Sequence, residues 1–199
     1  KLWIVKPRWG FSSKEIYLLD RVDNLIPRLG DSTYIIQEYL PGQCTGQPNN
    51  GTPGLLPPDG FTHFHYSYQV YINHLGELSP SFLACYHCEK GKWQGFHKIE
   101  EDQIESIATN AAQVLLKAGW KGFLNIEFQL DRNGQWKILE INGRNTGFTF
   151  ARYLLGYDEW GLMISDCFKS LAFPMPAKTS TAPDTQAVWQ SLDGSIYVD

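Results

Sequence analysis

Four polar residues in the second half of the chain have the types and spacing of a site for a divalent cation and phosphate. Glu127 lies among apolar residues in Phe123–Leu130, and Glu140 and Asn142 lie in the next apolar run. A carboxylate buried on an apolar strand is costly unless a positive charge pairs with it. Arg144 follows two residues after Asn142, and its planar guanidinium is suited to binding phosphate through two hydrogen bonds.

The sequence places these residues on a β-hairpin. The strands expected at 123–130 and 135–141 are joined by a turn that contains Asn133-Gly134, a pair typical of tight hairpins. Side chains alternate between the two faces of a strand. The polar residues that share one face of the first strand are Asn125, Glu127 and Gln129.

Glu140 and Asn142 share one face of the second strand, which is the antiparallel neighbour of the first. With Glu127 they bring two carboxylates and an amide oxygen to one space, and such oxygen ligands suit Mg²⁺. The alternative is a hairpin whose polar face contacts only water. Glu127 alone would favour that alternative, whereas the set that includes Arg144 favours the metal–phosphate site.

Short strands and a helix are expected ahead of this hairpin. Leu2–Val5 is an apolar run that ends at Lys6-Pro7, and Pro7 lacks the amide hydrogen that a central strand needs. A loop around Gly10, Ser12 and Ser13 follows. The next expected elements are a strand at Glu15–Leu19, a helix from Asp20 to about Leu29 and a strand at Thr33–Leu40.

The middle of the chain predicts a long loop, a second hairpin and a helix. Gln43–Gly60 is rich in Gly, Pro, Asn and Gln, as a loop is. Tyr66–Asn73 and Leu78–Cys88 alternate as the two strands of a hairpin. Glu101–Ala118 has apolar residues three and four apart, which form one helical face. These apolar residues are Ile104, Ile107, Ala108, Ala111, Val114, Leu115 and Ala118.

After the polar hairpin, Phe148–Leu155 and Trp160–Ala172 are expected to be helical, and Pro174–Asp199 is expected to be an extended tail. The chain of 199 residues has a net charge of -4 and no block of Lys or Arg, which argues against a nucleic-acid partner. No apolar run reaches the roughly 18 residues that a membrane span needs. The four cysteines show no disulfide spacing, so reduced thiols and a cytoplasmic location are expected.

Three segments in order resemble the ATP-grasp superfamily, which includes carbamoyl phosphate synthetase, biotin carboxylase, purine-pathway ligases and D-alanine–D-alanine ligase. Leu139-Glu-Ile-Asn-Gly-Arg144, preceded by Asn125-Ile-Glu-Phe128, resembles the metal-binding hairpin. Ile4-Val-Lys-Pro7 with the following Gly10-Phe-Ser-Ser13 resembles the lysine strand and the phosphate loop. Ile35-Ile-Gln-Glu-Tyr-Leu-Pro-Gly42 resembles the hinge between lobes. The resemblance covers residues 1 to about 173.

The resemblance implies an α+β fold of two lobes, with antiparallel sheets, packed helices and ATP between them. Residues 1–42 would belong to the small lobe, 43–175 to the large lobe and 176–199 to a C-terminal tail. The family also has an upstream phosphate-binding lysine and an N-terminal substrate domain that this sequence does not contain. Since the chain also opens within an expected strand, we expect that an N-terminal part is missing.

The resemblance also implies roles for single residues. Lys6 would contact the nucleotide phosphates, and backbone amides around Gly10, Ser12 and Ser13 would close over them. The adenine edge would pair with backbone groups of the hinge residues Gln37, Tyr39 and Leu40, with Glu38 nearby. Mg²⁺ or Mn²⁺ would be held by Glu127, Glu140 and Asn142. Arg144 and Lys6 would act in catalysis, Arg144 by stabilising the transferred phosphoryl group.

The implied activity is that of an ATP- and Mg²⁺-dependent ligase, which activates a small-molecule carboxylate as an acyl phosphate for attack by an amine. The sequence leaves open whether the protein forms a homodimer. One alternative is a non-catalytic ATP-binding module, or a fragment that needs a missing partner segment. Another is an antiparallel domain with a purely structural role, in which replacing Glu140 with alanine would leave any affinity for ATP unchanged.

Overall fold

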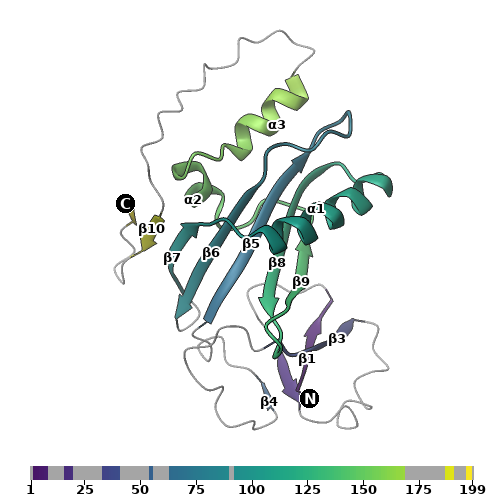
Figure 1. Ribbon diagram of the computed structural model, residues 1–199, viewed down its shortest axis with the longest axis vertical. Coiled ribbons are helices and arrows are strands. Elements are labelled where there is room, and N and C mark those ends of the chain that lie inside the picture. Colours follow the sequence, from purple (N-terminus) through teal and green to yellow (C-terminus); the bar gives the residue numbers. More distant parts are fainter. Residues whose placement is uncertain are drawn as a thin grey trace.

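The computed structural model describes residues 2–8, 16–19, 33–40, 54–55, 63–89, 92–168, 187–190 and 196–198. Within these ranges the strands form two antiparallel sheets, and three helices accompany the larger one (Figure 1). The expected α+β class with antiparallel sheets is therefore confirmed. None of the helices in the described ranges is long and apolar enough to span a bilayer.

The smaller sheet has four strands in the order β3-β1-β2-β4. Its strands are β1 (Trp3–Pro7), β2 (Tyr17–Leu19), β3 (Tyr34–Glu38) and β4 (Gly54–Leu55). The central strand β1 buries Val5, so the adjacent Lys6 points to the opposite face. Pro7 is the last residue of β1, where a missing amide hydrogen breaks no central pairing.

The larger sheet has seven strands in the order β11-β10-β7-β6-β5-β8-β9. These strands are β5 (His63–Ile72), β6 (Phe82–Glu89), β7 (Lys92–Lys98), β8 (Gly122–Leu130), β9 (Trp136–Asn142), β10 (Ala187–Gln190) and β11 (Ile196–Val198). The two expected hairpins are confirmed as β5–β6 and β8–β9. The ranges 187–190 and 196–198, expected in an extended tail, are extended but pair with β7 and with each other at the sheet edge.

The helices are α1 (Asp102–Lys117), α2 (Thr149–Leu154) and α3 (Glu159–Phe168). The Glu101 carboxylate accepts a hydrogen bond of 3.3 Å from the Gln103 amide, which caps the start of α1. α3 begins at Glu159, one residue before the expected start, and residues 169–172 of the expected helix lie outside the described residues. The expected helix at 20–29 and most of the expected loop at 43–60 lie outside the described residues.

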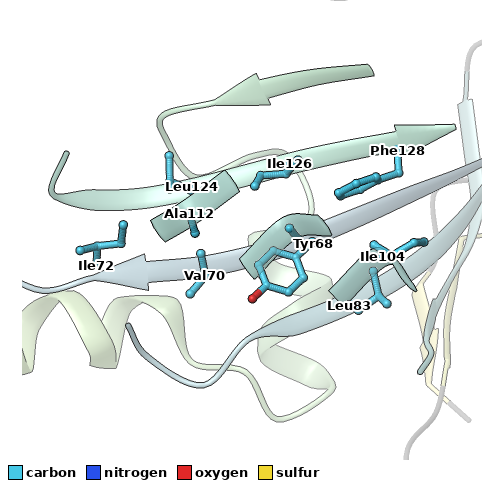
Figure 2. Packing of buried hydrophobic residues seen from close by; sticks show 10 residues of the cluster. Tyr68, Val70, Ile72, Leu83, Ile104, Ala112, Leu124, Ile126 and Phe128 are labelled. Carbon is cyan, nitrogen blue, oxygen red and sulfur yellow. The ribbon is translucent and has the colours of Figure 1, made fainter. Parts of the chain in front are cut away.

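One face of the large sheet packs its apolar side chains against α1 (Figure 2). Val70, Leu124 and Ile126 come from the sheet, and Ile104 and Ala112 come from the helix. All five are at most 1% exposed. Because strand side chains alternate, these even-numbered residues leave the odd-numbered ones of β5 and β8 for the opposite face.

The buried face of α1 differs in part from the expected one. Ile104 and Ala108 are buried as expected, but the third fully buried position is Ala112. Val114 is 66% exposed, and Ala118 is also exposed. A row of residues four apart packs on the sheet, and Val114 lies about 120° around the helix from that row. The expectation for Val114 and Ala118 was therefore wrong.

The opposite face of the large sheet packs on α2, α3 and the segments beside them. Its apolar part contains Phe82, Ala84, Tyr86 and Phe96 from the sheet, packed on Ala151, Leu155 and Tyr157. Beside this cluster lie buried polar side chains from β5 and β8. These side chains are Ser67, Gln69, Asn125 and Gln129. One face of the sheet is thus an apolar core, and the other is partly polar.

The packing on α1 predicts a difference between two truncations. Ile126→Ala should destabilise the protein by about 2–5 kcal/mol, because it leaves a cavity in a packed core. Val114→Ala should change the free energy of unfolding by no more than about 0.5 kcal/mol, because Val114 lies at the surface. Urea unfolding of both variants measures the difference, and similar losses would contradict the observed helix orientation.

Candidate functional site

A β-bulge in the β8–β9 hairpin brings Glu140 opposite Glu127. Near the turn, Phe128 pairs with Ile138, but the next pair is Glu127 with Glu140, which leaves Leu139 as an extra residue. Without the bulge, Glu140 would pair with Ile126 and point into the apolar core on α1. The extra residue therefore sets both carboxylates on the same face of the sheet.

The bulge puts two like charges directly opposite each other, which is unfavourable unless other groups compensate. Burial, and next the charge of Glu140, raise the pKa of Glu127 to about 7. A hydrogen bond of 3.3 Å from the Tyr86 hydroxyl acts in the other direction, as do the positive charges of Lys6 and Arg144. Near neutral pH, Glu127 can thus hold or release a proton.

Each carboxylate oxygen of Glu140 has a positive or hydrogen-bonding neighbour. Lys6 Nζ lies 3.7 Å from Glu140 Oε2, and Asn142 Nδ2 donates to Glu140 Oε1 at 2.9 Å. The Lys6 side chain is 18% exposed and comes from the small sheet, whereas Glu140 comes from the large sheet. The ion pair therefore joins the two sheets at the candidate site.

A second contact between the sheets lies next to the first. Gln37 Nε2 on β3 donates a hydrogen bond of 2.8 Å to the carbonyl oxygen of Leu139, the extra residue of the bulge. Gln37 was expected to act through its backbone at the hinge, and this role of its side chain was missed. A polar residue within an apolar strand was the only sequence signal for it.

The remaining hinge residues lie in and after β3. Glu38 is the last residue of the strand and is exposed, while Tyr39 is 6% exposed. The Tyr39 amide donates to the Leu2 carbonyl at 3.0 Å, and this bond competes with the expected pairing of Tyr39 to adenine. Leu40 follows in the described part of the chain. The expected phosphate-loop residues Gly10, Ser12 and Ser13 lie outside the described residues.

Arg144 is exposed just beyond β9. Its Nη1 donates to the Asn145 carbonyl oxygen at 3.1 Å, and its charge lowers the pKa of Glu127. Gly143, between Asn142 and Arg144, lies under the Trp120 ring. A Cβ atom at Gly143 would come within 2.4 Å of that ring, so a larger residue would have to displace it.

The expected metal ligands are brought together. Glu127 and Glu140 face each other across the ladder, and Asn142 lies two residues along on the same face as Glu140. Two carboxylates and an amide oxygen are the hard donors that Mg²⁺ binds, and a cation between the carboxylates would relieve their repulsion. The residues fit such an ion. Tyr86, which donates to Glu127, was not anticipated because it lies on β6, far away in sequence.

The raised pKa of Glu127 predicts how stability changes with pH. The folded protein keeps this proton up to about pH 7, whereas an ordinary glutamate of the unfolded chain loses it near 4.5. The contribution of Glu127 is therefore fully present below pH 4.5 and is lost as the pH rises through 7. Carbon-13 NMR titration of the Glu127 carboxyl measures the pKa directly.

Two variants test the causes of this shift. Glu140→Gln should lower the pKa of Glu127, because it removes the facing negative charge. Tyr86→Phe should raise it further, because it removes a hydrogen bond to the ionised form. A Glu127 pKa that does not move in Glu140→Gln would show that the two carboxylates do not interact.

Comparisons with known proteins identify the fold. No family model and no curated protein sequence matches the chain. Among solved structures, N5-carboxyaminoimidazole ribonucleotide synthetase from Thermus thermophilus matches 97% of this chain, with a TM-score of 0.58 and 14% identity. The Staphylococcus aureus N5-carboxyaminoimidazole synthetase in complex with ADP matches 95%, with a TM-score of 0.57 and 14% identity. Biotin carboxylase from Campylobacter jejuni matches 90%, with a TM-score of 0.56 and 15% identity.

The matches cover 47%, 45% and 39% of those three chains, so this chain spans less than half of their length. At such low identity the likeness concerns the fold and not the activity. The ATP-grasp resemblance seen in the sequence motifs is confirmed at the level of structure. Over most of its length, the chain matches the fold of the ATP-grasp enzymes.

Proposed function

We propose that this chain carries the ATP- and Mg²⁺-binding site of a ligase that activates a carboxylate as an acyl phosphate for attack by an amine. One observation carries the proposal: Glu127 and Glu140 face each other on β8 and β9, and Lys6 from the other sheet lies 3.7 Å from Glu140. A paired acidic site with a lysine at its edge can hold a divalent cation beside phosphate.

In this proposal Glu127, Glu140 and Asn142 hold Mg²⁺. When bound, the ion would neutralise phosphate charge and orient the phosphoryl group that is transferred. Release of the Glu127 proton is required before its carboxylate can be a ligand. Because its pKa is about 7, Mg²⁺ affinity should rise as the pH increases through neutrality.

The chain's own cations have distinct proposed roles. Lys6 would exchange its contact with Glu140 for one with a nucleotide phosphate, as a compact point charge. Arg144, exposed after β9, would bind the transferred group through its guanidinium. Backbone amides around Gly10, Ser12 and Ser13 would cover the phosphates, and the hinge from Gln37 to Leu40 would bind adenine.

The similar structures support a nucleotide as the ligand. Their names include an ADP complex of the Staphylococcus aureus enzyme and an ATP complex of the Aspergillus clavatus enzyme. An L-amino acid ligase from Bacillus licheniformis, with a TM-score of 0.51 and 12% identity, supports the ligase class. Small-molecule carboxylate and amine substrates follow from that class as part of the proposal.

The second candidate is an ATP-binding module that turns over only with a further segment, or not at all. The chain spans less than half of the length of the similar structures. Both candidates require Mg²⁺-dependent ATP binding, and they differ in turnover. Formation of ADP by the protein with candidate carboxylates and amines separates them.

The metal ligands predict the effect of one substitution. Glu140→Gln should weaken Mg²⁺-dependent ATP binding about tenfold or more, because the ion loses a charged ligand. Glu100→Gln is the matched control, because Glu100 is exposed and lies outside the site. Calorimetric titration with ATP at fixed Mg²⁺ gives both affinities. No binding by the unmodified protein, or equal affinities in both variants, would sink the proposal.

The lysine at the interface of the two sheets predicts a second effect. Lys6→Met should weaken binding of ATP more than binding of adenosine, because only ATP offers phosphates to the ammonium group. Lys137→Met is the control, since Lys137 is exposed on β9 and pairs with Asp131 at 3.7 Å. Parallel loss for ATP and adenosine would contradict a phosphate contact.

A further inference from the structure

α2 and α3 pack on the face of the large sheet that bears Glu127, and a buried ion pair joins these two helices. Arg152 Nε lies 2.5 Å from Glu159 Oε1, and the two side chains are 1% and 0% exposed. Burying two charges costs several kcal/mol of desolvation each, which their mutual attraction recovers only in good geometry. Stability alone is thus a weak reason for placing an ion pair here.

Each partner of this pair makes a second bond, and both bonds go to the loop after β9. Arg152 Nη2 donates to Thr146 Oγ1 at 3.0 Å. Asn145 Nδ2 donates to Glu159 Oε2 at 2.8 Å. The ion pair therefore binds two successive loop residues, and they directly follow Arg144.

The same loop is confined at its other end. Trp120 lies against Gly143 so closely that a Cβ atom there would be 2.4 Å from the ring. Arg144 lies between this contact and the two bonds at Asn145 and Thr146, and its Nη1 donates to the Asn145 carbonyl oxygen at 3.1 Å. Both ends of the short segment that carries Arg144 are fixed by packing and hydrogen bonds.

The position of this segment determines how the Arg144 charge acts on Glu127. The charges of Arg144 and Arg152 both interact with Glu127, Arg144 from an exposed position and Arg152 from a buried one. When the loop is held in place, the Arg144 guanidinium stays where its charge acts on Glu127, so an anion that binds there costs little side-chain and loop entropy. A free loop would lose that entropy at every binding event.

We infer that the Arg152–Glu159 ion pair is a positioning device, which fixes Asn145 and Thr146 and thereby holds Arg144 at the end of β9, where its charge acts on Glu127. The role of Arg144 toward phosphate rests on the proposed function, whereas the ordering of the loop does not. Arg152 and Glu159 touch no ligand in this scheme and act only through the loop.

The ordering of the loop is tested by limited proteolysis. Trypsin can cleave the bond after the exposed Arg144 only when the loop fits its active site. Glu159→Gln should increase the rate of that cleavage, followed by mass spectrometry, by roughly tenfold or more. Leu155→Ala is the control, because Leu155 is buried in the same region and bonds neither Asn145 nor Thr146. Equal acceleration in variants of equal unfolding free energy would overturn the inference.

Thr146→Val covers the case in which Glu159→Gln does not fold. It removes only the loop hydroxyl and leaves the ion pair intact. Because the buried Arg152 Nη2 loses its acceptor, the unfolding free energy should fall somewhat. At equal unfolding free energy, cleavage after Arg144 should be faster in Thr146→Val than in Leu155→Ala. No acceleration would overturn the inference.

A double-variant cycle tests whether the device acts through Arg144. Arg144→Gln and Glu159→Gln should each weaken Mg²⁺–ATP binding, and the double variant should be no weaker than Arg144→Gln alone. Additive losses would mean that Glu159 acts by another route. If the unmodified protein binds no ATP, the proposed function fails, while the proteolysis still decides whether the ion pair orders the loop.

Discussion

The one-residue bulge at Leu139 is the constraint on which the site depends. It shifts the register of β9 so that Glu140 faces Glu127 instead of Ile126, and Asn142 faces Asn125. A strand that slips by one residue turns every side chain to the other face. Without the bulge, the carboxylate of Glu140 would enter the apolar core beneath α1. The bulge also supplies the carbonyl that Gln37 binds, so it links the two sheets.

The facing carboxylates in turn explain the charges around them. Burial and the Glu140 charge destabilise ionised Glu127, and the compensating groups come from separate parts of the chain. Lys6 comes from the small sheet, Tyr86 from β6 and Arg144 from the loop after β9. Because these charges come from both sheets, the pKa of Glu127 should depend on how the two sheets lie relative to each other. In the proposed function, a nucleotide bound between the two sheets would therefore change the charge balance at the carboxylates.

The strands, turns and helices could be predicted from the sequence, whereas the contacts between distant elements could not. The Asn133-Gly134 turn and the alternation around Glu127 correctly placed the polar hairpin. The facing pair of Glu127 and Glu140 was expected from alternation, yet simple pairing from the turn would not produce it. A bulge leaves no clear trace in residue type. The side-chain bond from Gln37 and the exposed position of Val114 likewise depend on how distant elements pack, which period and propensity do not encode.

The two faces of the large sheet differ for a physical reason that bears on function. The face on α1 buries mostly apolar side chains around Val70 and Ile126, and the Tyr68 hydroxyl there is paired with Thr109 Oγ1 at 3.3 Å. Such an arrangement favours stability. The other face buries Gln69 and Asn125. Among the described residues, Gln69 Nε2, Gln69 Oε1 and Asn125 Oδ1 have no hydrogen-bond partner. Such groups cost free energy that apolar residues would avoid. These groups lie on the face that also bears Glu127 and that packs on α2, the helix of Arg152. We therefore infer that polar residues occupy this face because of the candidate site and not because they stabilise the fold.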